Sequence, residues 1–333
     1  MKTKVAVQNV HELEIRPARM LAEYHDLVRR AVESWAAAGD SLEAVGCPGC
    51  DAGEATPAFD RFGLSYRLCA RCSTLFASPR PSAASLRTYY DSSAPARFWR
   101  EQVLPATRPA RAEKISQPRA QWVVDGLAEH AARARTLADI SATGSRLGWL
   151  NAPGTPGSYA LDRLELEGAP SGARVIECSM DELPEQRVSD AITAFDVLDR
   201  VFSVPALLSA LRKALRPGGL LFLTGTSVTG FDLQVLWDRS PTITPPDKLN
   251  LLSIDAFRAR FGGGGFELIE LSTPGMFDVE TVQREVASSP GAAWPRVVRT
   301  LMHQLDDQAR QDLQEFLQAH RLGSFVRLMA RAI

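Results

Sequence analysis

The chain has 333 residues, of which 45% are hydrophobic, and its formal net charge is −1 at pH 7. This length can hold two domains, or one large domain with an added module. Because neither sign of charge dominates, the composition argues against a nucleic-acid partner and favours a small-molecule substrate or a protein partner.

The sequence predicts neither secretion nor a membrane span. Polar residues follow Met1 where a signal peptide would have an apolar run, and no stretch of 18 apolar residues occurs. Four of the five cysteines lie in two close pairs, which suits a reducing compartment and a metal site better than a disulfide framework. We therefore expect a cytoplasmic protein.

An amphipathic helix is predicted near the start of the chain. Between Pro17 and Ala38, apolar side chains recur at helical spacing, and Gly39 supplies a stop. We expect this helix to pack against the module that follows it.

Two C-x-x-C motifs form the most specific local signal. Cys47 and Cys50 make the first motif, and Cys69 and Cys72 make the second after eighteen residues. Four thiolates in this arrangement can surround a tetrahedral Zn²⁺, and they leave no ligand position free for water or substrate. The pattern predicts a zinc ribbon with a structural metal that helps the module to fold.

A connector rich in aromatic and basic residues follows the ribbon. It includes a short helix through Tyr89 and Tyr90, then Phe98 and Trp99, and then a segment containing Lys114, before a helix over residues 121–133. Such side chains either line a substrate cleft or brace two domains. Phe98, Trp99 and Lys114 are the candidate substrate contacts here, and Trp237, after the fifth strand of the later sheet, is either a pocket wall or a core residue.

From Thr136 onward, the pattern alternates between strands and helices. This alternation predicts a mostly parallel sheet covered on both faces, with ligands at the carboxyl ends of the strands. The predicted strands are residues 137–140, 159–161, 174–178, 191–195, 220–224, 266–271 and 325–330. Helices are predicted at 205–215 and 253–261, and a helical insert at 279–322 separates the last two strands.

Polar groups at successive strand ends suggest a nucleoside site. Asp139 ends the first strand, and the turn Ser141–Ser145 follows it with a single glycine, Gly144. Asp162 ends the second predicted strand, where a carboxylate can accept hydrogen bonds from both ribose hydroxyls. The remaining strand-end candidates are Ser179 and Met180 after the third strand, and Asp196, Val197 and Leu198 after the fourth.

The ordered motifs resemble class I S-adenosylmethionine-dependent methyltransferases, and more narrowly the group with an N-terminal zinc ribbon that is related to sugar C-methyltransferases of polysaccharide and natural-product pathways. The resemblance covers nearly the whole chain. It is carried by CPGC, LCARCSTLFASPRPS, ARFWREQVLPATRPARAEKI, TAFDVLDRV, LRPGGLLFLTGTS, PPDKLNLLS, GFELIELSTPG and SFVRLMAR.

The resemblance implies a Rossmann-like sheet of seven strands, the last one antiparallel, behind an N-terminal zinc-ribbon module. It divides the chain into residues 1–95 (helix and ribbon), 96–133 (helical connector or lid) and 134–333 (methyltransferase domain). By position, Asp162 would hold the ribose of adenosylmethionine, the turn at 141–145 its methionine part, and Ser179 with Met180 its adenine. Asp196, Val197 and Leu198 would flank the cofactor, with the substrate between the sheet and the connector.

The chain departs from the family pattern in the first turn and in its histidines. The usual turn has two or three glycines, whereas Ser141 and Thr143 or Ser145 stand in their place here. Lys248 stands where sugar C-methyltransferases place a histidine that is thought to act as the base, and it could do so only if burial lowered its pKa; a solvated lysine is the other interpretation.

Two functions follow from these observations. The first is methyl transfer from adenosylmethionine to a small molecule, such as a nucleotide-linked sugar or a natural-product intermediate, in a biosynthetic pathway. The second is a relative that no longer methylates, and that partners an enzyme of the same pathway or catalyses a different reaction.

Overall fold

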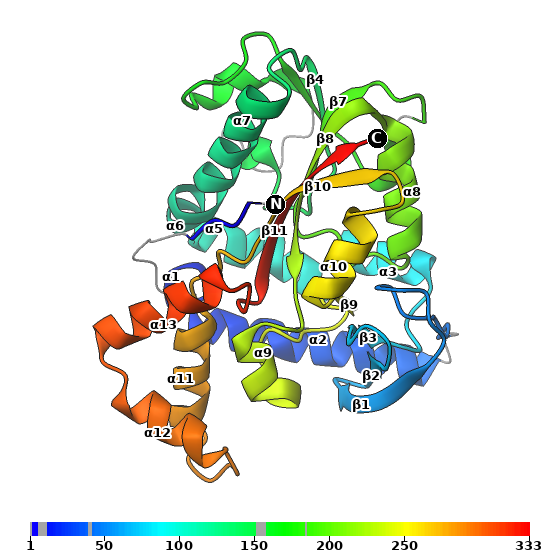
Figure 1. Cartoon of the computed structure of the whole chain (residues 1–333). Helices are drawn as coiled ribbons and strands as arrows, with labels where there is room; N and C mark the ends of the chain where they lie inside the picture. The colour runs from blue at the N-terminus through cyan, green and yellow to red at the C-terminus, as the bar shows by residue number, and fades with distance from the viewer. Residues whose placement is uncertain (1, 6–11, 39–41, 151–157, 184) are drawn as a thin grey trace.

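The computed structural model describes residues 2–5, 12–38, 42–150, 158–183 and 185–333. Two sheets organise this part of the chain, one of seven strands and one of four (Figure 1). In this view the N-terminus lies beside β10 and β11, and the C-terminus lies at the end of β11. The small sheet lies below the large sheet, beside the long helix α2 (Ala18–Ala38).

The large sheet has the seven strands and the antiparallel last strand that the family resemblance implies. Its spatial order is β10-β11-β8-β7-β4-β6-β5, and β11 runs antiparallel to both of its neighbours. The strands are β4 (Thr136–Asp139), β5 (Ser158–Ala160), β6 (Arg174–Glu177), β7 (Ser189–Ala194), β8 (Leu215–Thr226), β10 (Phe266–Ser272) and β11 (Phe325–Ala332). The fold is that of a Rossmann-like methyltransferase.

One half of the sheet departs from the resemblance, which names the last strand as the antiparallel one. β6 lies directly beside β4 and runs parallel to it, whereas β5 is a three-residue edge strand that pairs antiparallel with β6. The second strand in sequence therefore does not neighbour the first strand in space. This difference changes which acidic residue lies at the carboxyl edge of the sheet.

Alternating strand residues bury the two faces of the large sheet in two separate cores. In β8, Leu221 and Leu223 face the core formed with α8 (Val204–Ala214) and α10 (Ile254–Phe261). Leu220 and Phe222 face the opposite core, which contains α7 (Gln117–His130). This two-sided burial is what a parallel sheet requires, and it explains the continuous apolar run in β8.

The small sheet joins the ribbon to the rest of the chain. It consists of β1 (Ala55–Arg61), β2 (Leu64–Cys69), β3 (Leu75–Ala77) and β9 (Asn250–Leu251), in that order. β9 comes from the later part of the chain, so this sheet crosses the predicted boundary at residue 95. Tyr24, Val28 and Val32 of α2 pack on it, as the amphipathic pattern predicts.

Short helices build the connector, the insert and the remaining turns. The connector contains α3 (Ala83–Ser92), α4 (Ala94–Phe98), η1 (Trp99–Val103), α5 (Leu104–Ala106), α6 (Arg108–Arg111) and η2 (Ala112–Ser116). Between β10 and β11 lie α11 (Asp278–Ser288), α12 (Arg296–Gln304) and α13 (Asp307–Ala319). The others are α1 (Glu12–Ile15), η3 (Leu147–Leu150), η4 (Leu161–Leu164), η5 (Met180–Glu182), α9 (Phe231–Leu236) and η6 (Trp237–Arg239).

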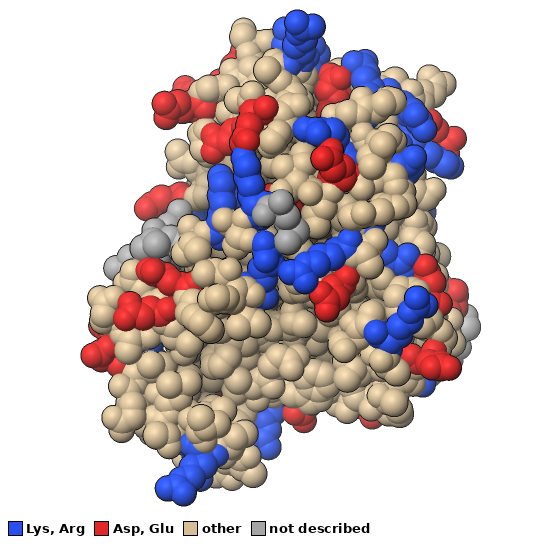
Figure 2. Space-filling model, in the orientation of Figure 1, with Lys and Arg blue, Asp and Glu red and all other residues tan. Residues whose placement is uncertain are grey.

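The surface and the helices agree with the balanced composition. Within the described ranges, none of the helices combines the length and the hydropathy needed to cross a bilayer. Lysine and arginine are interspersed with aspartate and glutamate over the face shown in Figure 2.

Candidate functional site

The end of β4 is the point from which the sheet extends in both directions. β6 lies on one side of β4 and β7 on the other, both parallel to it, and ligands of open α/β sheets bind outside the carboxyl ends of the strands at such a point. Asp139, fully buried at the end of β4, accepts hydrogen bonds from the backbone N–H groups of Ser141 (3.0 Å) and Leu147 (2.7 Å). The Asp139 carboxylate therefore fixes the backbone of the turn that follows β4.

Arg146 lies across the ends of β4 and β6. Its guanidinium donates to the carbonyl oxygens of Ser141 (Nε, 3.2 Å) and Cys178 (Nη2, 3.3 Å), and Nη1 lies 3.5 Å from Glu177 Oε2. Glu177 is the acid that ends β6, the strand next to β4. Burial and the nearby Asp139 raise the pKa of Glu177, which means that the partner cation only partly offsets the cost of burying this carboxylate.

Asp162 lies at the opposite edge of the sheet. Because β5 is antiparallel to β6, the last residue of β5, Ala160, pairs with the first residue of β6, Arg174. The end of β5 therefore lies at the amino end of β6. Asp162 is exposed in η4, and its Oδ2 accepts the N–H of Gly172 at 3.4 Å. Asp162 therefore follows β5, the second strand, but lies away from the turn after β4, and Glu177 is the acid found beside that turn.

Asp196 forms the other side of the strand-end site. It follows β7 and has a positive φ of 58°. Its carboxylate accepts hydrogen bonds from Arg119 Nη1 (2.8 Å), Ser145 Oγ (2.7 Å) and Thr224 Oγ1 (3.0 Å). Burial raises the pKa of Asp196, but the charge and hydrogen bonds of Arg119 outweigh it and hold this pKa well below its usual range. Asp196 is therefore an anion at neutral pH.

The other predicted cofactor contacts have mixed surroundings. Ser141 is buried, and its Oγ accepts the N–H of Phe195 at 2.9 Å. Ser179 is exposed and caps η5 together with Glu182, and Met180 packs against the core with Val197 and Leu198. Ser141 and Leu198 thus face inward, whereas Ser179 faces solvent.

The connector covers the turn at Gly144. This glycine has a φ of 83°, which favours glycine, and a Cβ built on it would lie 2.7 Å from Leu104 Cδ2 in α5. The glycine retained in the turn therefore allows the close approach of Leu104. In this structure the connector occupies space directly over the turn.

A cavity of about 310 Å³ lies between the edge of the large sheet, the connector, helices α1 and α2, and the start of α11. Of the predicted substrate and turn residues, Trp99, Lys114, Gly144, Asp196 and Lys248 line it. Phe98 and Trp237 pack instead with the apolar cluster around the ribbon. The cavity brings the connector and the turn to one space, and it leaves Phe98 and Trp237 outside.

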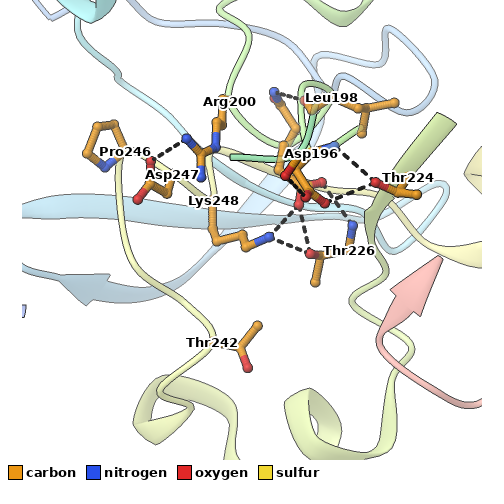
Figure 3. Close-up of polar contacts among 12 residues, drawn as sticks. Asp196, Leu198, Arg200, Thr224, Thr226, Thr242, Pro246, Asp247 and Lys248 are labelled. Carbon is orange, nitrogen blue, oxygen red and sulfur yellow. Dashed lines mark hydrogen bonds and ion pairs between the residues drawn. The ribbon is translucent and has the colours of Figure 1, made fainter. Parts of the chain in front are cut away.

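Lys248 lines this cavity and belongs to a network of polar contacts (Figure 3). Its Nζ is 2.5 Å from Asp199 Oδ2 and 2.7 Å from Thr226 Oγ1, and Asp199 is 1% exposed. Arg200 pairs with Asp247 at 3.4 Å on the other side. The sequence identified Lys248 but not its partner, because the pairing joins the loop after β7 to residues fifty positions later.

The four ribbon cysteines come together in space. Their Sγ atoms all lie within 4.8 Å of one another, with Cys47 and Cys72 at 3.4 Å and Cys50 and Cys69 at 3.5 Å. Tetrahedral Zn–S bonds of about 2.3 Å place sulfurs roughly 3.8 Å apart. The cluster could therefore hold a metal ion.

The strand-end residues accommodate adenosylmethionine only in part. The turn at 143–145 and Asp196 open onto the cavity, and Glu177 has the carboxylate that a ribose requires. However, Arg146 already holds Glu177 and spans both strand ends, and Leu104 covers Gly144. A nucleoside at this edge therefore requires Arg146 to move away.

A known protein family matches the part of the chain that forms most of the large sheet. Residues 120–271 match a family model described as a methyltransferase domain. This match agrees with the Rossmann-like methyltransferase fold that the seven-stranded sheet shows. The family model begins in α7 and ends in β10, so it spans the strand-end site and most of the sheet.

The individual relatives are distant. The chain is 33% identical over 89 residues to a highly reducing polyketide synthase from a fungal species, and the match covers 26% of this chain and 4% of that protein. The chain therefore spans only a small fraction of the length of this relative.

Solved structures with a similar fold include several methyltransferases. Magnesium protoporphyrin IX methyltransferase from Synechocystis PCC 6803, with bound SAH, is 13% identical, with coverage of 76% of this chain and 100% of that chain and a TM-score of 0.39. A possible histamine N-methyltransferase from Thermotoga maritima is 12% identical, covering 70% and 97%, with a TM-score of 0.38. These are likenesses of fold.

Proposed function

We propose that this protein transfers a methyl group from adenosylmethionine to a small polar molecule held in the cavity. The observation that carries the proposal is the position of the cavity, because it reaches the turn Thr143–Ser145 and Asp196 at the carboxyl edge of a methyltransferase sheet. An acceptor in the cavity would therefore lie next to the methionine side of a cofactor at this edge.

The residues that would hold the cofactor are grouped by strand. Glu177, at the end of β6, takes the ribose in place of Asp162, and the turn around Gly144 takes the methionine part. Ser141, Asp196, Val197 and Leu198 support the loops between these two contacts. Bound adenosylmethionine supplies an electrophilic methyl group on a sulfonium, and such a transfer depends on positioning and on exclusion of water more than on acid–base groups.

Lys248 acts as a hydrogen-bond donor in this proposal. Its ammonium group pairs with buried Asp199 and donates a hydrogen bond to Thr226. We therefore assign Lys248 to orientation of the acceptor, not to proton abstraction. Trp99 supplies an apolar part of the cavity wall, and Lys114, which pairs with Glu14, also lines the cavity.

The acceptor class and the setting follow the same reasoning. The 89-residue likeness to a polyketide synthase supports a natural-product intermediate as acceptor, and the zinc-ribbon resemblance supports a nucleotide-linked sugar. The four clustered cysteines would hold one structural zinc. A cytoplasmic location suits the free thiols.

A specific observation favours the second candidate, a protein that no longer methylates. Arg146 satisfies Glu177 and two strand-end carbonyls, and Leu104 fills the space over Gly144, so the protein makes for itself the contacts that a nucleoside would make. If these contacts are permanent, the cavity would bind a ligand for another reaction or for a pathway partner.

Calorimetric titration with adenosylmethionine and adenosylhomocysteine separates the two candidates. Methyl transfer requires saturable binding of one cofactor per chain. Heat absent at millimolar ligand, both in the natural protein and after Arg146→Ala, would leave the non-methylating function.

A further inference from the structure

The charges that line the cavity are almost all matched by a partner. Seven lysine and arginine side chains line it, and within the described part of the chain six of them pair with a carboxylate. The pairs are Arg16 with Glu12 (3.1 Å), Lys114 with Glu14, Arg119 with Asp196 (2.8 Å), Arg200 with Asp247 (3.4 Å), Lys248 with Asp199 (2.5 Å) and Arg327 with Glu270 (2.7 Å). The seventh cation, Arg111, makes no ion pair among these residues.

Arg111 is fixed in place by neutral groups. Its Nε donates to Thr107 Oγ1 (2.9 Å), and its Nη2 donates to the carbonyl oxygen of Ile15 (2.8 Å). Its guanidinium carbon lies 5.2 Å from the centre of the Trp99 ring, a cation–π distance. A guanidinium has five N–H donors, on Nε, Nη1 and Nη2. The hydrogen bonds above use Nε and Nη2, and Nη1 makes no hydrogen bond to any described residue.

The surroundings of Arg111 are electropositive. Burial and the neighbouring charges of Arg16 and Arg119 lower the pKa of Arg111 to about 9, and Asp196 offsets this only in part. Arg111 therefore stays charged at neutral pH at an electrostatic cost, which a bound anion would remove. A held guanidinium with a free edge, beside an aromatic ring, is suited to a planar oxyanion.

We propose that Arg111 binds a carboxylate or phosphate group of the small molecule that occupies the cavity. Trp99 holds the guanidinium from one face, Thr107 and Ile15 fix its position, and Nη1 donates to the oxyanion. The inference rests on the proposed function only in taking this cavity as the ligand site. The oxyanion comes either from the acceptor or from the methionine part of the cofactor.

The test measures the binding of three probes to the natural protein, Arg111→Met and Arg111→Lys. Adenosylhomocysteine carries the methionine carboxylate, 5′-deoxy-5′-methylthioadenosine keeps the nucleoside but lacks that carboxylate, and inorganic pyrophosphate represents an acceptor oxyanion. Arg100→Met is the matched control, because Arg100 donates to the carbonyl oxygens of Tyr90 and Asp91 (both 2.8 Å) from the same connector and does not line the cavity.

Because Arg111→Met removes a charge-assisted hydrogen bond, it should lower the affinity for the probe that carries the recognised oxyanion by about tenfold or more. Arg111→Lys should restore part of this affinity, and Arg100→Met should leave it unchanged. If Arg111→Met binds adenosylhomocysteine more weakly but methylthioadenosine as well as the natural protein does, the oxyanion belongs to the cofactor. If Arg111→Met binds pyrophosphate more weakly, the oxyanion belongs to the acceptor. If Arg111→Met binds all three probes as well as the natural protein does, the proposal is wrong.

Two further outcomes are informative. Pyrophosphate that binds through Arg111 while both nucleosides fail would overturn the methyltransferase proposal and leave this inference standing. If Arg111→Met does not fold, the natural protein decides the question. Its thermal midpoint should rise with pyrophosphate at constant ionic strength, or rise more with adenosylhomocysteine than with methylthioadenosine. If neither oxyanion probe has this effect, the proposal is contradicted.

Discussion

At the scale of single residues, strand order places Glu177, and not Asp162, at the carboxyl edge of the sheet beside β4. Asp162 has the position in the sequence at which a ribose-binding acid is expected, but it is exposed at the amino edge of the sheet. Glu177 ends the strand that lies beside β4 and pairs with Arg146. The periodicity that predicted both strands carries no information about which one neighbours β4.

This strand order gives a paired prediction. Glu177→Gln removes the carboxylate that would accept two ribose hydroxyls, and it should weaken the binding of adenosylhomocysteine by about tenfold or more. Asp162→Asn is the control and should leave binding unchanged. Calorimetry on both variants measures the difference; a loss in Asp162→Asn alone would restore the original assignment.

A second residue-scale prediction concerns Asp232, which lines the cavity and is 2% exposed. Burial and the neighbouring Asp278 raise the pKa of Asp232 to about 8, and Asp232 Oδ1 has no hydrogen-bond partner among the described residues. An aspartate in the unfolded chain titrates near 3.9. Between these two values the folded protein binds more protons than the unfolded chain.

The sign of the pH dependence follows from this difference. The stability contributed by Asp232 is complete below about pH 4 and is lost as the pH rises towards 8. Asp232→Asn, which stays neutral, should flatten the fall in the free energy of unfolding between pH 5 and pH 8. Urea unfolding at pH 5, 6.5 and 8 measures this slope, and equal slopes in the two proteins would refute the assignment.

At the scale of elements, the cysteine spacing predicts the ribbon ligands but not the neighbours of the ribbon. The four sulfurs converge as the two C-x-x-C motifs predict. However, the ribbon strand β3 pairs with β9, whose residues lie about 175 positions further along the chain. That pairing depends on long-range packing, which local motifs do not encode.

The shared sheet connects metal loss to the cavity. Lys248 lies two residues before β9, and its carbonyl oxygen accepts a bond from Tyr66 of β2 at 2.7 Å. Removing zinc, or changing Cys72→Ser, should unfold the ribbon and lower the free energy of unfolding by several kcal/mol, because metal binding contributes on the order of 10 kcal/mol to such modules. Either change should also lower the affinity for ligands that bind in the cavity.

Metal analysis and thermal unfolding before and after chelation measure this effect. We expect one zinc per chain in the purified protein and a lower, less cooperative transition without it. Cys178→Ser is the matched control, since Cys178 lies outside the cluster. Protein that holds no metal and is indifferent to chelators would contradict the zinc assignment.

At the scale of the whole molecule, the site is assembled from segments that the sequence keeps apart. Helix α1, the connector, the turn after β4, the loops after β7 and β8, and the start of α11 all contribute to one cavity. The sequence predicted the sheet and several of these segments, because periodicity and motifs are local. It did not predict Arg146 or Leu104 as occupants of the strand edge, because their contacts depend on strand order and on the connector path.

The central claim is that the carboxyl edge of β4 and β6 binds the nucleoside of adenosylmethionine once Arg146 moves aside. The measurement that tests it most directly is the dissociation constant of adenosylhomocysteine for the natural protein and for Arg146→Ala. Removing a side chain that competes for Glu177 should tighten binding by about tenfold, equivalent to roughly 1.4 kcal/mol. Equal or weaker binding in Arg146→Ala, or no binding to either protein, would contradict the account.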